Sequence, residues 1–265
     1  YHNTFTSRYV AEKINAGKKY IWVHNDLLTT KYNYKYTYSY IGNFDKIFCV
    51  SKSLKDEIDA CYGNAIDVLN KVDVFYNSID YEKIIRLANE PQTEISKDTM
   101  SILSVGRLNA QKGFDLAVKV AQKLKENNEK FCWYIIGEGE DQKKLGKLIN
   151  KLKIEDCFKL LGKKENPFKY MRVCDIYVQP SRHEGYCTTT NEVKAFAKPV
   201  IVTDVAGMSE QFTNGIDGMI VKVDVNDIYC AIKSLLSNTE LKHRLAKNVR
   251  MQVSNNEMIE EYFTI

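Results

Sequence analysis

The chain has 265 residues, enough to bury a sizeable core in one large or two modest domains. Its 38 Lys and Arg residues against 34 Asp and Glu residues give a net charge of only +4, which is too mild to indicate nucleic acid as a partner. The composition, 44% hydrophobic and 27% charged, is typical of a globular protein, and no apolar stretch has the length of a membrane-spanning helix.

Short apolar runs alternate with helical patterns along most of the chain. The helical patterns include residues 114–124 and 227–236. This alternation predicts an α/β fold in which parallel sheets are covered by helices. The predicted strands are 20–24, 46–50, 72–76, 101–106, 132–137, 158–161, 175–179, 199–203 and 219–223.

A polar segment without periodicity, residues 88–98, separates three predicted strands from six. It contains Pro91 and predicts a linker. We therefore expect a first domain over residues 1–90, a linker over 91–98 and a second domain over 99–252 with a complete open sheet.

Two segments of the chain are less regular. Residues 31–40 alternate tyrosine with polar residues, which is compatible with a strand, a helix or an irregular segment. Residues 253–265 include a short helical pattern, which we expect to form a C-terminal helix that packs back toward the first domain.

The seven cysteines are scattered, with no C-x-x-C pair and no Cys/His spacing that would suit a metal. Most lie in apolar runs. They therefore predict reduced core residues of a cytoplasmic protein.

Residues 180–192 (PSRHEGYCTTTNE) contain two carboxylates separated by seven residues. Glu184 is predicted in a loop and Glu192 on the helix that follows. If the intervening residues were helical, the carboxylates would stand ~12 Å apart. This separation suits two acids that hold diols at opposite ends of an elongated ligand, and a helix N-terminus between them favours phosphate. Diol, diphosphate and second diol in line describe a nucleotide sugar.

This stretch resembles the E-x7-E signature of the GT-B glycosyltransferases, family 4 in particular. Three further segments resemble motifs of that family in the same order: 104–114 (SVGRLNAQKGF), 198–204 (KPVIVTD) and 214–221 (NGIDGMIV). The resemblance implies two Rossmann-like domains and transfer of a sugar from a UDP- or GDP-linked donor, with retention of configuration, to a glycan or lipid-linked acceptor. The family's glycine-rich acceptor loop has no match here, so we expect an incomplete N-terminal domain and a truncated fragment of a longer enzyme.

The resemblance assigns the donor diphosphate to Arg107 and Lys112. Breaking the sugar–phosphate bond leaves negative charge on the nucleoside diphosphate, which two fixed cations would stabilise. The alternative is that both are solvated surface cations, the commonest state of Lys and Arg.

By the same resemblance, Glu184 binds hydroxyls of the transferred sugar and Glu192 binds the ribose hydroxyls. The alternative treats Thr188 as a helix N-cap and Glu192 as a first-turn carboxylate, which leaves Glu184 unexplained. Cys187 and the two residues after it replace the family's frequent Gly-Leu-Pro, so the identity of the sugar stays open. The expected substrate-binding residues are Gly106, Lys163, Gly185, Tyr186, Cys187, Thr188 and Glu192.

The remaining roles are assigned to the ends of other strands. The family places a histidine where His24 ends a strand, which makes it a candidate proton donor or hydrogen-bond partner, although an ordinary strand-end histidine is an equal alternative. Residues 162–168, with Lys163, correspond to the family's nucleobase loop. Asn166 as N-cap and Pro167 at the first helical position would explain the same segment as a plain loop and helix start.

Two cofactor-based alternatives are weak. Residues 135–140 (IIGEGE) begin like a dinucleotide fingerprint, but Gln142 stands where a third glycine is required. The D-x-D metal motif is absent. We therefore expect no cofactor and no metal ion.

Two other functions remain open. The chain could be a nucleotide-sugar-binding module without transferase activity, or a GT-B relative that epimerises or phosphorolyses its sugar. The family's acceptors also suggest peripheral association with the inner face of the cell membrane.

Overall fold

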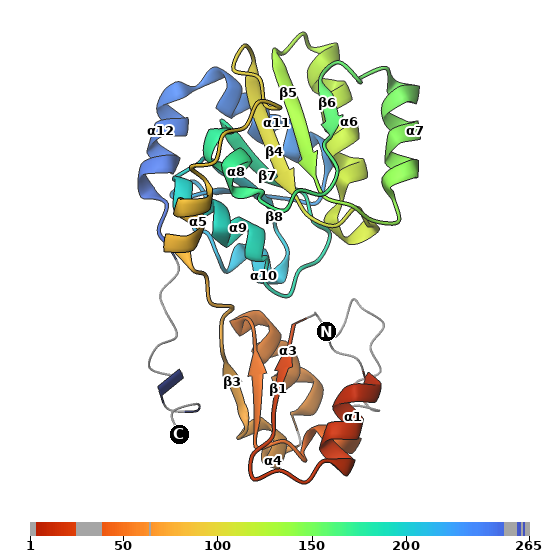
Figure 1. Cartoon of the computed structure of the whole chain (residues 1–265), viewed down its shortest axis with the longest axis vertical. Helices are drawn as coiled ribbons and strands as arrows, with labels where there is room; N and C mark the ends of the chain where they lie inside the picture. Colours follow the sequence, from red (N-terminus) through yellow and green to blue (C-terminus); the bar gives the residue numbers. More distant parts are fainter. Residues whose placement is uncertain (1–3, 25–38, 64, 252–258, 261, 263–265) are drawn as a thin grey trace. The chain divides into compact units, whose positions relative to one another are not determined.

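The computed structural model describes residues 4–24, 39–63, 65–251, 259–260 and 262. The chain folds into two compact units (Figure 1). Unit 1 comprises Tyr1–Ser78, His183–Cys187 and Val253–Ile265, and unit 2 comprises Ile79–Arg182 and Thr188–Gln252.

Unit 1 contains a parallel sheet of three strands in the order β1 (Tyr20–Val23), β2 (Lys46–Cys49) and β3 (Val72–Val74). The central strand is the best buried, because Ile47, Phe48 and Cys49 have no exposed surface. Ser51 follows it and caps the next helix by accepting a hydrogen bond from the Leu54 amide. Among the described residues of this unit, the helices with defined bounds are α1 (Thr4–Lys13), α3 (Lys52–Tyr62) and α4 (Ile66–Leu69).

Unit 2 contains a six-stranded sheet in the order β6-β5-β4-β7-β8-β9, and all neighbouring strands are parallel. Every residue of the apolar run Phe131–Ile136 is buried, as expected for a strand covered by helices on both faces. The strands are β4 (Met100–Val105), β5 (Phe131–Ile136), β6 (Phe158–Leu160), β7 (Ile176–Gln179), β8 (Val200–Thr203) and β9 (Met219–Val221).

Helices α6 and α11 pack against each other and supply much of the core of unit 2 (Figure 1). Their apolar residues recur with helical spacing, so that one face of each helix is buried. The helical elements of unit 2 are α5 (Tyr81–Leu87), η1 (Ala110–Lys112), α6 (Phe114–Glu126), α7 (Gln142–Leu152), α8 (Phe168–Val173), α9 (Thr188–Val193), η2 (Lys194–Phe196), α10 (Ala206–Ser209), α11 (Val225–Ser237) and α12 (Thr239–Asn248), where η marks a 3-10 helix.

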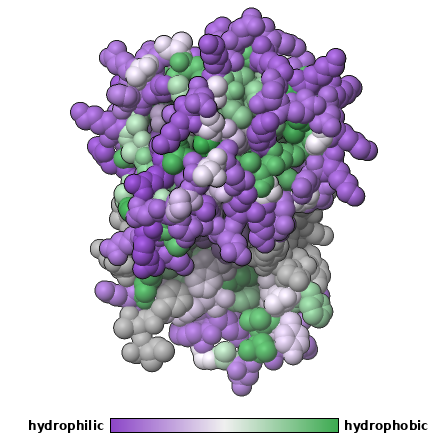
Figure 2. Space-filling model, turned by 45° about the horizontal axis from the view of Figure 1, so that its top comes forward, coloured by the Kyte–Doolittle hydropathy of each residue, from purple (hydrophilic) through white to green (hydrophobic). Residues whose placement is uncertain are grey.

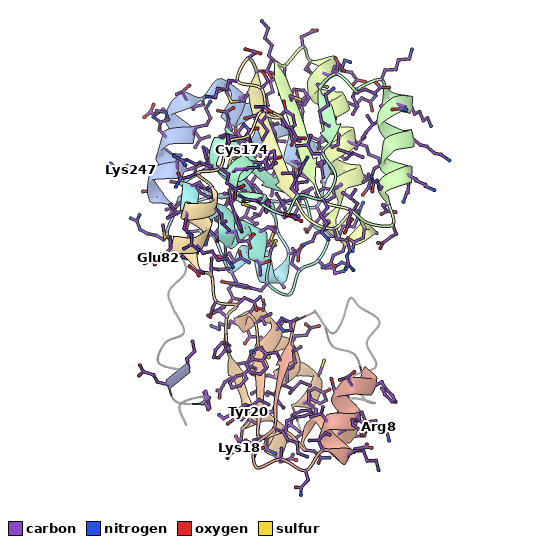
Figure 3. All side chains as sticks on the ribbon, viewed as in Figure 1. Arg8, Lys18, Tyr20, Glu82, Cys174 and Lys247 are labelled. Atoms are coloured by element: carbon purple, nitrogen blue, oxygen red, sulfur yellow. The ribbon has the colours of Figure 1, made fainter. Side chains whose placement is uncertain are left out.

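Polar residues lie mainly on the surface of unit 2 and apolar residues mainly inside it. The face shown in Figure 2 is mainly hydrophilic on unit 2, with small hydrophobic areas between the charged side chains. Lys247 and Glu82 project outward, whereas Cys174 lies inside unit 2 with no exposed surface (Figure 3). All seven cysteines are free thiols. Four are buried as predicted, whereas Cys61 and Cys157 are partly buried and Cys230 is exposed.

The nine predicted strands are all present, with ends that differ by one or two residues. The parallel sheets and the helices over 114–124 and 227–236 are also confirmed. Of the tyrosine-rich segment 31–40, residues 31–38 lie outside the described residues, whereas Ser39 and Tyr40 are helical. Most of the predicted C-terminal helix also lies outside the described residues, but Tyr262 is described, and its hydroxyl donates to Asp73 Oδ2 at 3.1 Å.

Unit 2 begins earlier in the chain than the predicted boundary. Residues 79–90 belong to it because α5 packs against α8 and η2, and because Asn166 Nδ2 donates to the Leu87 carbonyl at 2.9 Å. The predicted linker, residues 91–98, also lies on unit 2. Ile95 is buried there, and Glu94 pairs with Lys164 at 2.8 Å.

Candidate functional site

The order of the strands in unit 2 marks one place where a ligand can bind. From β4 the chain proceeds through β5 to β6 on one side, and then through β7 and β8 to β9 on the other. The loops after β4 and β7 therefore diverge, although the two strands are paired neighbours. Open α/β sheets bind ligands at such a switch point, at the carboxyl ends of the strands. Both major sequence motifs follow one of these two strands.

The loop after β4 is fixed by backbone hydrogen bonds to the chain after β5. Leu108 is buried, its amide donates to the Glu138 carbonyl, and its own carbonyl accepts from the Asp141 amide, each at 2.9 Å. Asn109 caps η1 by accepting from the Lys112 amide. Arg107 is exposed beside the buried Leu108, so its cationic side chain extends from a well-ordered loop.

The Gly106 amide is used within the sheet, and the lack of a side chain at this glycine leaves room for Lys112. The Gly106 amide donates to the Ile136 carbonyl at 3.0 Å and so belongs to the sheet. A Cβ atom at Gly106 would lie 3.3 Å from both Cδ and Cε of Lys112. The aliphatic stem of Lys112 therefore passes close over this glycine, and a side chain there would crowd it.

The chain after β4 and the chain after β7 are in close contact at Gly113 and are hydrogen-bonded through Arg182. Gly113 has a left-handed backbone (φ +67°), and a Cβ atom there would lie only 1.9 Å from the Pro180 carbonyl oxygen, so glycine is required. Arg182 donates from two guanidinium nitrogens to the Asp115 carboxylate, at 2.7 Å each, and from its amide to the Gln111 carbonyl at 2.7 Å.

Sequence reasoning missed Arg182, because its partner Asp115 lies 67 residues earlier in the chain. The only signal in the sequence was that Arg182 lies next to the motif that contains Glu184 and Glu192. The guanidinium beside Asp115 holds the pKa of that carboxyl below its usual value, while the same hydrogen bond raises the pKa of Arg182.

Helix α9 places Glu192 in unit 2 as a partly buried carboxylate. The helix begins at Thr188, which is exposed, and Glu192 is its fifth residue. The alternative in which Thr188 caps the helix and Glu192 lies in the first turn does not match this start. Burial raises the pKa of Glu192. No hydrogen bond or ion pair to its carboxylate occurs within the described residues, so it can accept hydrogen bonds from ligand hydroxyls.

Lys163 lies beyond β6 at the same edge of the sheet. Its Nζ is 3.2 Å from Glu138 Oε1, and both side chains are exposed. In the loop that follows, Asn166 Oδ1 accepts from the Phe168 amide at 3.1 Å. The alternative considered above is shifted by one residue, because α8 begins at Phe168 and its N-cap is Pro167 rather than Asn166. Glu138 is a second residue at this edge that sequence reasoning missed.

The loop 183–187 belongs to unit 1, where it meets the end of β1. A Cβ atom at Gly185 would lie 2.0 Å from the His24 carbonyl oxygen, so the close backbone approach at this glycine is to His24. The Tyr186 ring packs on the core of unit 1, with its centroid 5.3 Å from that of Tyr76. Glu184 is 5% exposed.

His24 is half-buried and lines a cavity of about 250 Å³ between α1 and β1, together with residues such as Ser7, Val10 and Trp22. Burial lowers its pKa. The neutral imidazole is therefore favoured near neutral pH, and this form can both donate and accept a hydrogen bond.

The predicted site residues thus fall into two groups. Gly106, Arg107, Lys112, Lys163, Thr188 and Glu192 lie in unit 2, and His24, Glu184, Gly185, Tyr186 and Cys187 lie in unit 1. The E-x7-E motif itself is divided between the two units, with its first acid in unit 1 and its second in unit 2.

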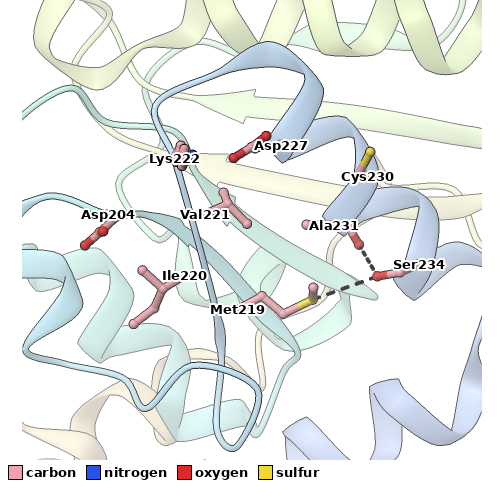
Figure 4. A pocket seen from close by; sticks show the side chains of 9 residues that line it. All are labelled: Asp204, Met219, Ile220, Val221, Lys222, Asp227, Cys230, Ala231 and Ser234. Atoms are coloured by element: carbon pink, nitrogen blue, oxygen red, sulfur yellow. Dashed lines mark hydrogen bonds between the residues drawn. The ribbon is translucent and has the colours of Figure 1, made fainter.

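A cavity of about 570 Å³ lies elsewhere in unit 2, between the edge strand β9 and helix α11 (Figure 4). None of the predicted site residues lines it. The side chains around it are mainly apolar with a few polar groups: Asp204, Met219, Ile220, Val221, Lys222, Asp227, Cys230, Ala231 and Ser234. It is therefore separate from the switch point.

The described residues contain neither a metal-binding cluster nor a membrane-spanning helix. No group of three or more His, Cys, Asp or Glu side chains among them has the arrangement of a metal site. None of the helices in that part of the chain is long and apolar enough to cross a membrane.

Known structures share this fold at low sequence identity. The Anabaena protein HepE, solved with UDP and glucose, aligns with a TM-score of 0.76 and 16% identity over 94% of this chain and 72% of its own. A glycosyltransferase from Rickettsia africae aligns with a TM-score of 0.74 and 20% identity over 98% of this chain and 74% of its own. The fold is of the GT-B type, as the sequence predicted.

Curated proteins match at higher identity. An uncharacterized glycosyltransferase of Methanocaldococcus jannaschii is 32% identical over 221 residues, which cover 82% of this chain and 56% of that protein. The N-acetylgalactosamine-N,N'-diacetylbacillosaminyl-diphospho-undecaprenol 4-alpha-N-acetylgalactosaminyltransferase of Campylobacter jejuni is 33% identical over 174 residues, which cover 65% of this chain and 46% of that enzyme.

The chain spans about half the length of these curated relatives. The model of the family described as glycosyl transferases group 1 matches residues 86–252, which include the whole sheet of unit 2 and both loops of the switch point. The chain therefore belongs to the glycosyl transferases group 1 family.

Proposed function

We propose that this chain carries the donor site of a retaining glycosyltransferase, which moves a sugar from a nucleoside diphosphate sugar to a glycan or lipid-linked acceptor. The observation that carries the proposal is the switch point of unit 2. There, Arg107 and Lys112 follow β4, and α9 with Glu192 follows β7. Membership of the family supports the reaction class, and the narrower assignment to family 4 stays a prediction.

Different parts of the donor molecule would contact protein side chains of opposite charge. Arg107 and Lys112 are suited to the diphosphate, since Arg can hold two oxygens at once and Lys acts as a compact charge. The half-buried Glu192 carboxylate is suited to the ribose diol, and Glu184 to hydroxyls of the transferred sugar. Solved neighbours with UDP or with UDP and glucose support a nucleotide-linked donor, although the base for this chain stays open.

In the reaction, the bond between the anomeric carbon and the β-phosphate oxygen breaks, and its electron pair leaves with the nucleoside diphosphate. Arg107 and Lys112 stabilise the charge that develops on this leaving group. The acceptor hydroxyl oxygen bonds to the anomeric carbon from the same face, and its proton passes to the departing phosphate. His24, whose neutral form burial favours, acts as a hydrogen-bond partner. The mechanism requires no metal ion.

The proposed class of acceptor, a glycan or a lipid-linked molecule, is inferred from the names of similar proteins. The Campylobacter enzyme is named for a diphospho-undecaprenol substrate, and a neighbouring structure contains alpha-GlcNAc-glycerol and fondaparinux. A lipid-linked acceptor would bring the protein to the cytoplasmic face of a membrane, and we propose peripheral association there.

Calorimetry of this chain with UDP and with GDP tests the donor site, and an assay of sugar transfer tests the reaction. We expect one nucleotide to bind, and we expect Glu192→Gln to weaken this binding. Glu240→Gln, an exposed carboxylate on α12, is the matched control. If neither nucleotide binds, the donor site is wrong. Nucleotide binding without sugar transfer would favour a nucleotide-sugar-binding module.

A further inference from the structure

Two side chains of the segment that carries Glu192 are buried against a single residue, Gln211. Thr190 is fully buried, and its Oγ1 donates to Gln211 Oε1 at 2.6 Å. Lys194 is only 7% exposed, and its Nζ donates to the Gln211 carbonyl at 2.6 Å. Lysine is rarely buried to this extent, so its retention inside unit 2 calls for a specific role.

Gln211 is itself held firmly. Its Nε2 donates to the Gly207 carbonyl at 2.7 Å, and its amide donates to the Met208 carbonyl at 3.0 Å. The side-chain amide and both backbone groups of Gln211 are therefore bonded to α9, η2 or α10. Buried polar networks of this kind, when fully bonded, specify one arrangement of the elements that they join.

The charge of Lys194 is also accommodated by its surroundings. Its Nζ lies 4.5 Å from the centroid of the Phe212 ring, in the position of a cation–π contact. Burial lowers the pKa of Lys194 to about 8, and the charge of Asp217 acts in the opposite direction. The lysine thus stays largely protonated at neutral pH and can donate to Gln211.

The spacing of residues in a helix places the contacts to Gln211 on one face of the segment and Glu192 on the opposite face. Thr190 and Lys194 are four residues apart, so they lie on one face of the helical segment, while Glu192 midway between them lies on the opposite face. The observed burial agrees, because Thr190 and Lys194 are buried and Glu192 is partly exposed. Rotation of this short segment would move the Glu192 carboxylate and break both bonds to Gln211.

We infer that Thr190, Lys194 and Gln211 are positioning residues that fix the rotation of α9 and thereby hold the Glu192 carboxylate at the nucleotide-binding edge. None of them has to touch the ligand. The inference rests on the proposed donor site, and it adds a specific set of buried contacts on which that site depends.

Matched substitutions separate this role from general packing. Thr190→Val keeps the shape but removes the hydroxyl and leaves Gln211 Oε1 without this donor, whereas Thr190→Ser keeps the hydroxyl. Lys194→Met removes the Nζ bond but keeps most of the stem. Lys198→Met, a partly exposed lysine just after the same helical segment, is its control.

Two measurements are needed: hydrogen exchange of the amides at residues 189–194, and calorimetry with UDP and GDP. We expect Thr190→Val and Lys194→Met to speed exchange of these amides by about tenfold or more and to weaken binding of the preferred nucleotide roughly 3- to 30-fold. Thr190→Ser and Lys198→Met should stay within about twofold of the original protein on both measurements.

Unchanged exchange in Thr190→Val and Lys194→Met would overturn the inference, as would faster exchange with unchanged nucleotide affinity. If Lys194→Met fails to fold, the Thr190 pair decides. If the original protein binds neither UDP nor GDP, the proposed donor site is contradicted and the role toward the ligand falls with it. The exchange data then still show whether the contacts to Gln211 fix α9.

Discussion

Arg182 and Asp115 form a bidentate ion pair that spans the switch point of unit 2, with both nitrogen–oxygen distances at 2.7 Å. Asp115 lies in the first turn of α6, after the loop with Arg107 and Lys112, and Arg182 immediately precedes His183 and Glu184. Within unit 2, the pair therefore holds the start of α6 against the chain that follows β7. Its geometry matters more than its charge, because a lysine cannot make two parallel bonds.

We predict that Arg182→Lys weakens nucleotide binding several-fold and lowers the stability of unit 2 by about 1 kcal/mol, since both side chains are about one-third exposed and solvent screens their attraction. Calorimetry and urea unfolding would measure the two effects. Lys125→Ala, which removes the exposed pair with Asp156 and a hydrogen bond to the Lys153 carbonyl, is the control and should lower stability less than Arg182→Lys does. Equal effects of both substitutions would contradict a special role for Arg182.

The same pair predicts an acid dependence. Arg182 holds the pKa of Asp115 below its unfolded value of 3.8, so the stabilisation is complete above that value and is lost as the pH falls through the folded-state pKa. The unfolding midpoints of the original protein and of Asp115→Asn should therefore converge as the pH drops below about 4. A difference that is independent of pH would show that the pair does not stabilise the fold.

Arg107→Ala should weaken binding of the preferred nucleotide by about 10- to 100-fold, because a charge-assisted hydrogen bond contributes about 1.5–3 kcal/mol. The fold should remain intact, since Arg107 is exposed. Arg244→Ala, an exposed arginine on α12, is the matched control and should bind as the original protein does. Unchanged affinity in Arg107→Ala would remove this residue from the proposed diphosphate site.

Ala197 ends η2 in a left-handed conformation (φ +47°), which is unfavourable for a residue with a Cβ atom. We predict that Ala197→Gly stabilises unit 2 by about 0.5–1 kcal/mol, because relief of this strain outweighs the added freedom of glycine in the unfolded chain. Ala246→Gly, inside helix α12, should instead destabilise by about 1 kcal/mol. Urea unfolding of the two variants would show opposite signs, and destabilisation by both would refute the strain.

Lys194 predicts a dependence on alkaline pH. Its folded-state pKa is about 8 and its unfolded value is 10.5, so between these values folding releases a proton and stability rises with pH. The contribution amounts to roughly 3 kcal/mol across this window, and it is absent in Lys194→Met. Trp22 in unit 1 and Trp133 in unit 2 are the only tryptophans, so a Trp22→Phe background reports unit 2 alone.

Urea unfolding of that background, with and without Lys194→Met, would be compared at pH 7, 8.5 and 10. The stability of the lysine protein should increase relative to the methionine variant as the pH rises. Parallel changes in the two proteins would mean that Lys194 has a normal pKa in the folded state.

Local sequence patterns were sufficient to predict all nine strands. The inner strands of unit 2 are largely apolar runs, because helices cover both faces of the sheet, whereas the edge strand β6 contains the exposed Lys159. The motif after β7 also predicted its own local structure, a loop with Glu184 followed by a helix with Glu192. Such features depend on neighbours within about a dozen residues.

The boundary of unit 2 and the contacts between distant segments could not be predicted in this way. Residues 79–98 look like the end of one domain and a linker, yet Leu87 and Ser96 are hydrogen-bonded to partners in unit 2 that lie more than thirty residues away. Arg182 with Asp115, and Lys194 with Gln211, are likewise pairs whose members carry no mutual signal in the sequence.

The sequence by itself determined the alternation of strands and helices, the family motifs and the residue types available for a nucleotide sugar, because each of these depends on local spacing and side-chain chemistry. Only the tertiary structure decided which strands are neighbours at the switch point, which charged residues hold the loops in place, and that Glu192 is supported by a buried lysine and glutamine. These relationships arise when parallel strands bring loops together that are far apart along the chain.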